Sequence, residues 1–210
     1  MKKILIVLIV TSLITSCAAF RRHYYYNMKL VDVEANNSKA GVISNERTAR
    51  GIIFGVYRDD AIEASMTFHP SYVDLMMKNK TESTIKVIWD EAVFLRLDSV
   101  SDGIIHSGVF FRDKNLSQIP SSVIKGSKLS TIIVPKGNML IDNNKVVGRN
   151  FLPRTERFVG NNIMIEIPII INDERVDYMF VFKSSYEKVK GISFRNTGFG
   201  GLCFNAVDWF

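Results

Sequence analysis

The sequence is poor in the residues that build metal sites and covalent frameworks. It contains two cysteines, Cys17 and Cys203, and three histidines. Two cysteines are too few for a four-cysteine zinc site or for a framework of several disulfide bonds. The histidines, His23, His69 and His106, are widely separated, so a three-histidine metal site would need all of them to converge. We therefore expect no metal or other cofactor and a solvated setting for each histidine.

The chain also lacks the short motifs of common catalytic sites. It has no Gly-x-Ser-x-Gly elbow, and the glycine-rich stretch 198–201 precedes no helical pattern. The paired carboxylates Asp59-Asp60 and Asp90-Glu91 are adjacent, so on a strand their side chains point to opposite faces. Neither pair can span a sugar as glycosidase carboxylates do. We expect a protein that is not an enzyme; an enzyme acting on cell-wall or extracellular glycan is the less favoured alternative.

Positive charge is in mild excess and is not clustered. The whole chain has 27 Lys and Arg against 21 Asp and Glu, a formal net charge of +6. Without the first 16 residues, 25 basic residues would remain against 21 acidic ones. A nucleic-acid-binding domain usually shows a clustered basic face. No such face is evident in the sequence, so we expect no nucleic-acid partner.

The longest apolar run lies at the N-terminus. Lys2 and Lys3 precede the apolar residues 4–10, and the segment ends in Ile14-Thr15-Ser16-Cys17. The run is shorter than the roughly 20 residues that span a bilayer, so a cleaved targeting peptide is the better interpretation. The Ile-Thr-Ser-Cys order resembles the lipobox of bacterial lipoproteins. This resemblance implies a signal peptide over 1–16, a lipid on Cys17 and attachment to the bacterial outer membrane.

Residues 17–50 are expected to form the lipidated N-terminus and a tether. Within it, the candidate membrane-surface residues are Arg21, Arg22, Tyr24, Tyr25 and Tyr26. Arginines attract anionic head groups, and tyrosines suit the membrane–water interface. A first strand that packs on the domain is the alternative. Residues 34–41 are rich in turn-forming residues and predict a loop or linker. No acidic residue occurs between the cysteine and Asp32, which favours the periplasmic face over the cell surface.

Apolar residues alternate with a period of two over most of 51–210. The predicted inward-facing sets are Ile62, Ala64, Met66 and Phe68; Val73, Leu75 and Met77; Ile85, Val87 and Trp89; Val93, Leu95 and Leu97; Ile105, Val109 and Phe111; and the odd-numbered isoleucines of 163–171. Short alternating strands between turn signals predict an all-β antiparallel sandwich with little helix. Glu91 falls on an apolar position and predicts a bulge or bend. Pro168 predicts an edge strand or a bulge.

Part of this domain resembles a known group of proteins. The stretches 73–81 and 85–90, ending in Trp89-Asp90, are similar to small envelope lipoproteins of Gram-negative gut bacteria that have no assigned function. Weaker similarity continues through 105–109 and 119–122 to Val134-Pro135. The resemblance implies an immunoglobulin-like sandwich and an envelope location. It implies no catalytic residues, and the Cys…Trp…Cys signature of true immunoglobulin domains is absent.

The C-terminal tail ends in Trp209-Phe210, and these aromatic residues need burial somewhere. Docking on the same domain is one interpretation, and strand addition to a partner is the other. The leading hypothesis is a non-enzymatic envelope lipoprotein whose β-sandwich acts through protein or glycan contacts. The alternative is an accessory subunit of a secretion or outer-membrane assembly complex. In that case either the strand 163–171 or the aromatic tail would dock, because exposed sheet edges are natural pairing sites.

Overall fold

The computed structural model describes residues 24–188, except 37, 40, 50–51, 143–144 and 153–155. Its strands are β1 (Tyr24–Ala35), β2 (Val42–Arg47), β3 (Ile53–Arg58), β4 (Ile62–Phe68), β5 (Val73–Asn79), β6 (Ile85–Val87), β7 (Val93–Leu95), β8 (Ser101–His106), β9 (Ser121–Val123), β10 (Lys128–Pro135), β11 (Met139–Asp142), β12 (Lys145–Gly148), β13 (Asn162–Ile171) and β14 (Glu174–Lys188). Four short 3₁₀ turns accompany them: η2 (Trp89–Glu91), η3 (Phe111–Asp113), η4 (Lys136–Asn138) and η5 (Glu156–Phe158). The predicted all-β class with little helix is confirmed.

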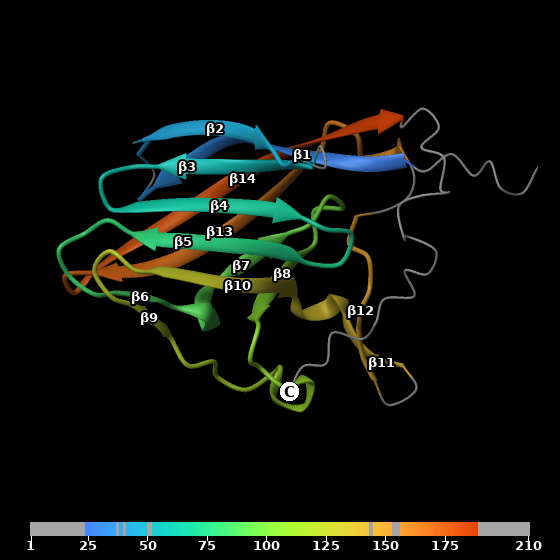
Figure 1. The fold of residues 1–210 in the computed structure, drawn as a ribbon. Helices are drawn as coiled ribbons and strands as arrows, with labels where there is room; N and C mark the ends of the chain where they lie inside the picture. The colour runs from blue at the N-terminus through green and yellow to red at the C-terminus, as the bar shows by residue number, and fades with distance from the viewer. Residues whose placement is uncertain are drawn as a thin grey trace, which may run out of the picture.

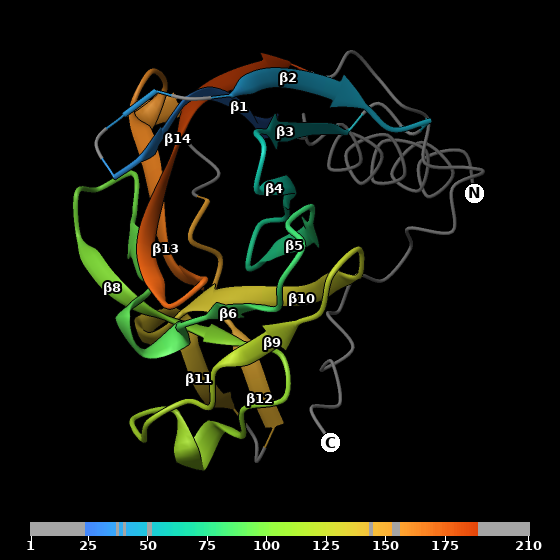
Figure 2. The ribbon, with the colours of Figure 1, turned by 90° about the vertical axis from the view of Figure 1, so that its left-hand side faces the viewer.

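Twelve of these strands belong to one antiparallel sheet, which bends into a sandwich-like arrangement. The main path runs β1-β14-β13-β7-β8-β10-β5-β4-β3-β2, and β6 and β9 join it beside β13. Figure 1 shows β2 to β5 and β10 as one layer, with β13 and β14 crossing behind it. The perpendicular view in Figure 2 shows the sheet curving between these two layers. The hairpin of β11 and β12 pairs separately and projects away from the sandwich.

The core between the layers is built by the predicted alternation. On β4 the buried residues are Ile62, Ala64 and Met66, and on β5 every odd-numbered residue from 73 to 79 is buried. Four of the odd-numbered isoleucines on β13 are fully buried. They pack in one cluster with Trp89, Phe94 and Phe180. Ile105, Val109 and Phe111 also pack together as predicted, in a smaller second cluster.

The two ends of the sheet path meet through a side chain. β1 contacts β2 and β3 without a strand ladder between them. Instead, the Leu30 amide donates to Asn45 Oδ1 at 2.9 Å, and Asn45 Nδ2 donates back to the Leu30 carbonyl at 2.9 Å. The pairing of β1 with β14 shifts register beside Leu30. Gly55 permits the close approach, because a Cβ there would lie 2.6 Å from Leu30 Cβ and 2.9 Å from a Phe182 ring carbon.

The expected tether over 17–50 is corrected by these two strands. β1 pairs with β14 from Tyr24 to Ala35, and β2 pairs with β3 from Val42 to Arg47. The described part of 17–50 therefore belongs to the sheet. The alternative expectation, a first strand that packs on the domain, fits β1. Met28, Leu30 and Val33 of β1 are buried in the core. Even-numbered residues face the core before the register shift at Leu30, and odd-numbered residues face it afterwards. The sequence therefore shows no single alternation over β1.

The bend predicted at Glu91 is present as η2, which separates β6 from β7. Of the predicted inward-facing set Val93, Leu95 and Leu97, Leu97 is buried as predicted, and the prediction for Val93 and Leu95 is wrong. Ala92 and Phe94 are buried instead, while Val93 and Leu95 are only half-buried. A 3₁₀ turn advances the chain by a different rotation from a strand, so the inward-facing set changes from odd to even across η2.

The edge strand that Pro168 suggested is a central strand. β14 pairs along one side of β13, and β7 and β6 pair along the other. The β7 ladder ends at Glu166 and the β6 ladder begins at Ile169, so Pro168 lies in the gap between them. The Pro168 carbonyl accepts from the Ile88 amide at 2.9 Å. A strand residue's N–H and C=O point to one side, so the missing N–H falls at this gap and no ladder bond is lost. β13 therefore offers no free edge to a partner.

Candidate functional site

The longest connection between two strands joins β8 to β9 over residues 107–120, called here the β8–β9 loop. Gly108 has a positive φ of 97° and turns the chain out of β8. The loop then folds on itself, because the Asp113 amide donates to the Phe110 carbonyl at 2.9 Å and the Leu116 amide donates to the Asp113 carbonyl at 2.8 Å. Connections of this length are uncommon in compact domains and usually serve either a function or as a linker.

The far end of the loop is fixed by Asp90 and Gln118. Asp90 Oδ1 accepts from the Gln118 amide at 2.7 Å, and Asp90 Oδ2 accepts from the Ser117 hydroxyl. The Ser117 hydrogen bond, followed by the Gln118 amide, lowers the pKa of Asp90. The buried Gln118 side chain donates to the Ile104 carbonyl at 2.7 Å. The far end of the loop is therefore tied to the strand and turn beneath it.

Trp89 and His106 form the floor beneath the start of the loop. Trp89 is fully buried, and its Nε1–H donates to the Ser121 hydroxyl oxygen at 2.8 Å. The His106 ring stacks on the indole at a centroid distance of 4.7 Å and an interplanar angle of 25°. Burial lowers the pKa of His106, so the imidazole is neutral at pH 7. The expectation that His106 is solvated is wrong, because the strand face taken as polar is covered by Trp89.

On this scaffold the loop presents large apolar side chains to solvent. The exposed fractions are 48% for Phe110, 61% for Leu116 and 83% for Ile119. Arg112 lies over the Phe110 ring at 5.3 Å, and Lys114 lies over the Phe111 ring at 4.4 Å. Exposed apolar residues beside aromatic and Arg side chains are typical of protein interfaces. The arrangement is suited to binding, and its preorganisation lowers the ordering cost of association.

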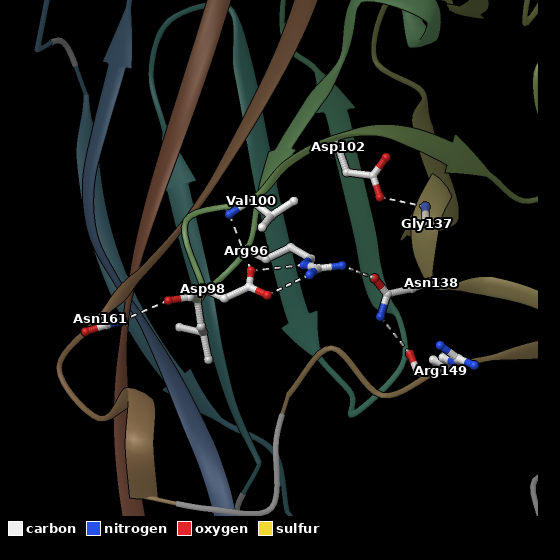
Figure 3. A network of polar contacts seen from close by, with 9 residues as sticks. Arg96, Asp98, Val100, Asp102, Gly137, Asn138, Arg149 and Asn161 are labelled. Atoms are coloured by element: carbon white, nitrogen blue, oxygen red, sulfur yellow. Dashed lines mark hydrogen bonds and ion pairs between the residues drawn. The ribbon is translucent and has the colours of Figure 1, made fainter.

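A polar network around the β7–β8 turn braces the fold (Figure 3). Arg96 makes a bidentate contact with Asp98, with Nε–Oδ1 at 3.1 Å and Nη2–Oδ2 at 2.6 Å. Its Nη1 donates to Asn138 Oδ1 at 3.2 Å, and Asn138 Nδ2 donates to the Arg149 carbonyl at 3.1 Å. The hydrogen bond from Arg96 lowers the pKa of Asp98. The network ties the β7–β8 turn to both ends of the β11–β12 hairpin. The side chains of Arg96, Asp98 and Asn138 each have a hydrogen-bond partner within the network.

Asp59 and His69 also form hydrogen bonds that stabilise the fold. Asp59 follows β3, and its carboxylate accepts from the hydroxyls of Tyr57 at 3.0 Å and Tyr178 at 2.9 Å. His69 Nε2 lies 2.9 Å from Asp74 Oδ2, and its ring stacks on Tyr72. The His69 side chain is 27% exposed, so it remains partly solvated while it makes these contacts. Within the part of the chain that the structure describes, no three His, Cys, Asp or Glu side chains gather as a metal site would require.

Most of the site residues expected from the sequence lie outside the described residues: Cys17, Arg21, Arg22, Trp209 and Phe210. His23 and Cys203 also lie outside them. Tyr24 and Tyr25 are the first residues of β1. The half-buried Tyr26 ring meets Tyr186 edge to face at 5.3 Å, and its hydroxyl accepts from the Phe158 amide at 3.4 Å. Tyr26 therefore contributes to packing within the domain.

The β8–β9 loop was not among the sites expected from the sequence. The available signal was the pair Phe110-Phe111, followed by Leu116 and Ile119 in a segment without strand alternation. In comparisons with known proteins, no family model, curated protein or solved structure matches the chain. Among the described residues, no helix is long and apolar enough to cross a membrane.

Proposed function

We propose that this chain is a non-enzymatic lipoprotein of the bacterial outer membrane that recognises a protein partner through its β8–β9 loop. The exposure of Phe110, Leu116 and Ile119 on a loop whose far end is hydrogen-bonded to the domain carries the proposal. Leaving three large apolar side chains in water is unfavourable for an isolated domain, and a partner that covers them gains roughly 25 cal/mol for each Å² of apolar surface buried. The lipobox resemblance at Cys17 supports the membrane attachment.

A protein partner fits the loop better than a lipid surface does. The charges at its tip are mixed, because Arg112 lies 3.4 Å from Asp113, with Lys114 next to it. Loops that bind anionic membranes carry clustered positive charge, whereas aromatic, aliphatic and Arg side chains together are typical of protein hot spots.

Site-specific photocrosslinking in living cells tests the proposal. A photoreactive amino acid at Leu116 should capture one protein, and mass spectrometry should identify it. The double variant Leu116→Ser/Ile119→Ser should lose that partner at least tenfold, because two apolar anchors are removed. Val42→Ser is the matched control, since Val42 is 67% exposed on β2, and it should retain the partner.

The identity of the captured protein separates the two forms of the proposal. A component of a secretion or outer-membrane assembly complex would make the chain an accessory subunit of that machine. Crosslinks only to phospholipid, or equal capture by the double variant and by Val42→Ser, would contradict the proposed interface.

Proteinase treatment of intact cells tests the location, with Cys17→Ala as the unlipidated control. We expect protection until the outer membrane is permeabilised, in accordance with a periplasmic domain. Digestion in unbroken cells would place the domain on the cell surface instead.

A further inference from the structure

A hollow of about 650 Å³ lies open on the outer face of the β3–β4–β5–β10 layer. This layer is at the front in Figure 1. The hollow is lined by Glu63 and Ser65 of β4, Met76 and Lys78 of β5, Gly126 and Ser127 of the β9–β10 turn, and Lys128 of β10. Its volume is in the range of small-molecule sites. No residue of the β8–β9 loop lines it, so a ligand here would be separate from the proposed partner.

The hollow carries two positive charges that the described residues do not neutralise. Lys78 and Lys128 stand directly opposite each other on neighbouring strands. Like charges in this position destabilise a sheet. Glu63 faces Lys78 from β4, but its carboxylate pairs with Arg58 at 3.3 Å. Neither lysine side chain forms an ion pair within the described part of the chain. The two lysines therefore leave an excess of positive charge in the hollow, which would attract an anion.

Two common anionic ligands fit this site poorly. A compact phosphate is usually held by several free backbone amides. Here the Gly126 amide donates to the Asn79 carbonyl at 3.1 Å and the Ser127 amide to the Ile124 carbonyl at 3.0 Å. An acidic peptide that binds as an added strand needs an unpaired edge. β4 and β5, which form the floor of the hollow, are each paired on both sides.

We propose that the hollow binds a saccharide that carries carboxylate or sulfate groups. Lys78 and Lys128 contact two separate acidic groups as point charges. Met76, which is 42% exposed, offers an apolar surface to the C–H face of a sugar ring. The Ser127 hydroxyl donates to the Ile124 carbonyl at 2.8 Å, and its oxygen remains able to accept from a sugar hydroxyl. No atom lies within 4 Å of a Cβ placed on Gly126, so the ring has room beside the turn.

Calorimetric titration of the full chain in neutral detergent tests this inference. The probes are oligogalacturonate, which carries carboxylates, a sulfated chondroitin oligosaccharide, neutral dextran oligosaccharide and inorganic phosphate. We expect at least one acidic saccharide to bind, with an affinity that falls as salt rises, and no measurable binding of dextran or phosphate. Lys78→Gln/Lys128→Gln should weaken the binding at least tenfold, and Lys78→Arg/Lys128→Arg should retain it within about threefold.

The chain supplies a matched control for nonspecific charge effects. Lys29 and Lys183 also stand directly opposite each other, on β1 and β14, and neither lines the hollow. Lys29→Gln/Lys183→Gln should leave the saccharide affinity unchanged. Equal weakening by both double variants, no binding of either acidic saccharide, or equal binding of phosphate would overturn the inference. Thermal unfolding of Lys78→Gln/Lys128→Gln should show a midpoint no lower than that of the unchanged chain, so a loss of binding would report the site and not the fold.

Discussion

Asp59 ties the β3–β4 turn to β14 through a single carboxylate. Oδ1 accepts from the amides of Ala61 at 2.8 Å and Ile62 at 2.7 Å, which forms the turn. Oδ2 accepts from the buried hydroxyls of Tyr57 and Tyr178. Burial first, and the charge of Asp59 next, raise the pKa of both tyrosines, so both remain neutral donors at ordinary pH. The paired carboxylates of the sequence thus divide into a structural residue, Asp59, and an exposed neighbour, Asp60.

Asp59→Asn should lower the free energy of unfolding by about 1–3 kcal/mol, because the amide nitrogen cannot accept from the donors that one carboxylate oxygen now serves. Urea denaturation measures the change. Asp60→Asn is the matched control and should stay within about 0.5 kcal/mol of the unchanged chain. Equal effects of the two substitutions would show that the tyrosine contacts contribute nothing.

His106 should make stability depend on pH. Burial lowers its pKa in the folded protein, whereas histidines of an unfolded chain titrate near pH 6.5. The unfolded state therefore binds the proton first as the pH falls. The stability is complete above about pH 6.5 and declines as the pH drops towards the folded-state pKa. His106→Phe keeps a ring against Trp89 and removes this titration. Between pH 7 and 5 the variant should lose less stability in urea denaturation than the unchanged chain, and parallel curves would contradict the assignment.

At the scale of elements, η2 changes which positions face the core between β6 and β7. β6 pairs with β13 through Val87, and β7 pairs with β13 through Val93 to Leu95. Between them η2 reverses which residues face the core, and Pro168 of β13 lies at the same break. The bend and the proline are therefore one feature, since the interrupted ladder is what permits proline in a central strand.

Truncation of side chains on β7 tests which of its positions face the core. Phe94 is fully buried, so Phe94→Ala should cost about 3–5 kcal/mol of unfolding free energy. Leu95 is half-buried, so Leu95→Ala should cost about 1 kcal/mol. Guanidinium denaturation of both variants compares them directly. A larger loss for Leu95→Ala would support the uninterrupted alternation instead.

The whole molecule is closed by few contacts between the ends of its sheet path. Asn45 satisfies both backbone groups of Leu30, in place of a ladder between β1 and β2. Gly55 lies opposite Asn45 and lets Leu30 and Phe182 approach β3. β1 also forms a long ladder with β14, so backbone pairing anchors it on one side, and the Asn45 amide and the packing of Leu30 on Gly55 anchor it on the other.

Asn45→Ala should leave the Leu30 N–H and C=O without partners and lower the unfolding free energy by about 1–3 kcal/mol. Hydrogen exchange should report the local change, with faster exchange at the Leu30 amide and little change on β5. Ser44→Ala, one residue earlier on β2, is the control. If exchange at Leu30 is unaffected, the closure through Asn45 does not hold in solution.

The sequence by itself determined the all-β class, the inward faces of β4, β5, β6 and β13, and the bend at Glu91. These follow from alternation and from one charged residue out of phase, which are local signals. The hollow on the β3–β4–β5–β10 layer had no local signal in the sequence. Lys78 and Lys128 are far apart in the chain, and only the pairing of β5 with β10 places them opposite each other.

Only the tertiary structure determined which side chains are buried, and which strands pair, after each break in the alternation. It placed β1 in the sheet, turned Phe94 inward and made β13 central, because strand pairing between distant segments fixes the register and the number of neighbours. It also left Phe110, Leu116 and Ile119 in solvent, whereas the neighbouring Val109 and Phe111 pack into a cluster. An apolar residue has the same hydropathy in either place, so only the packing of the folded chain separates core from surface.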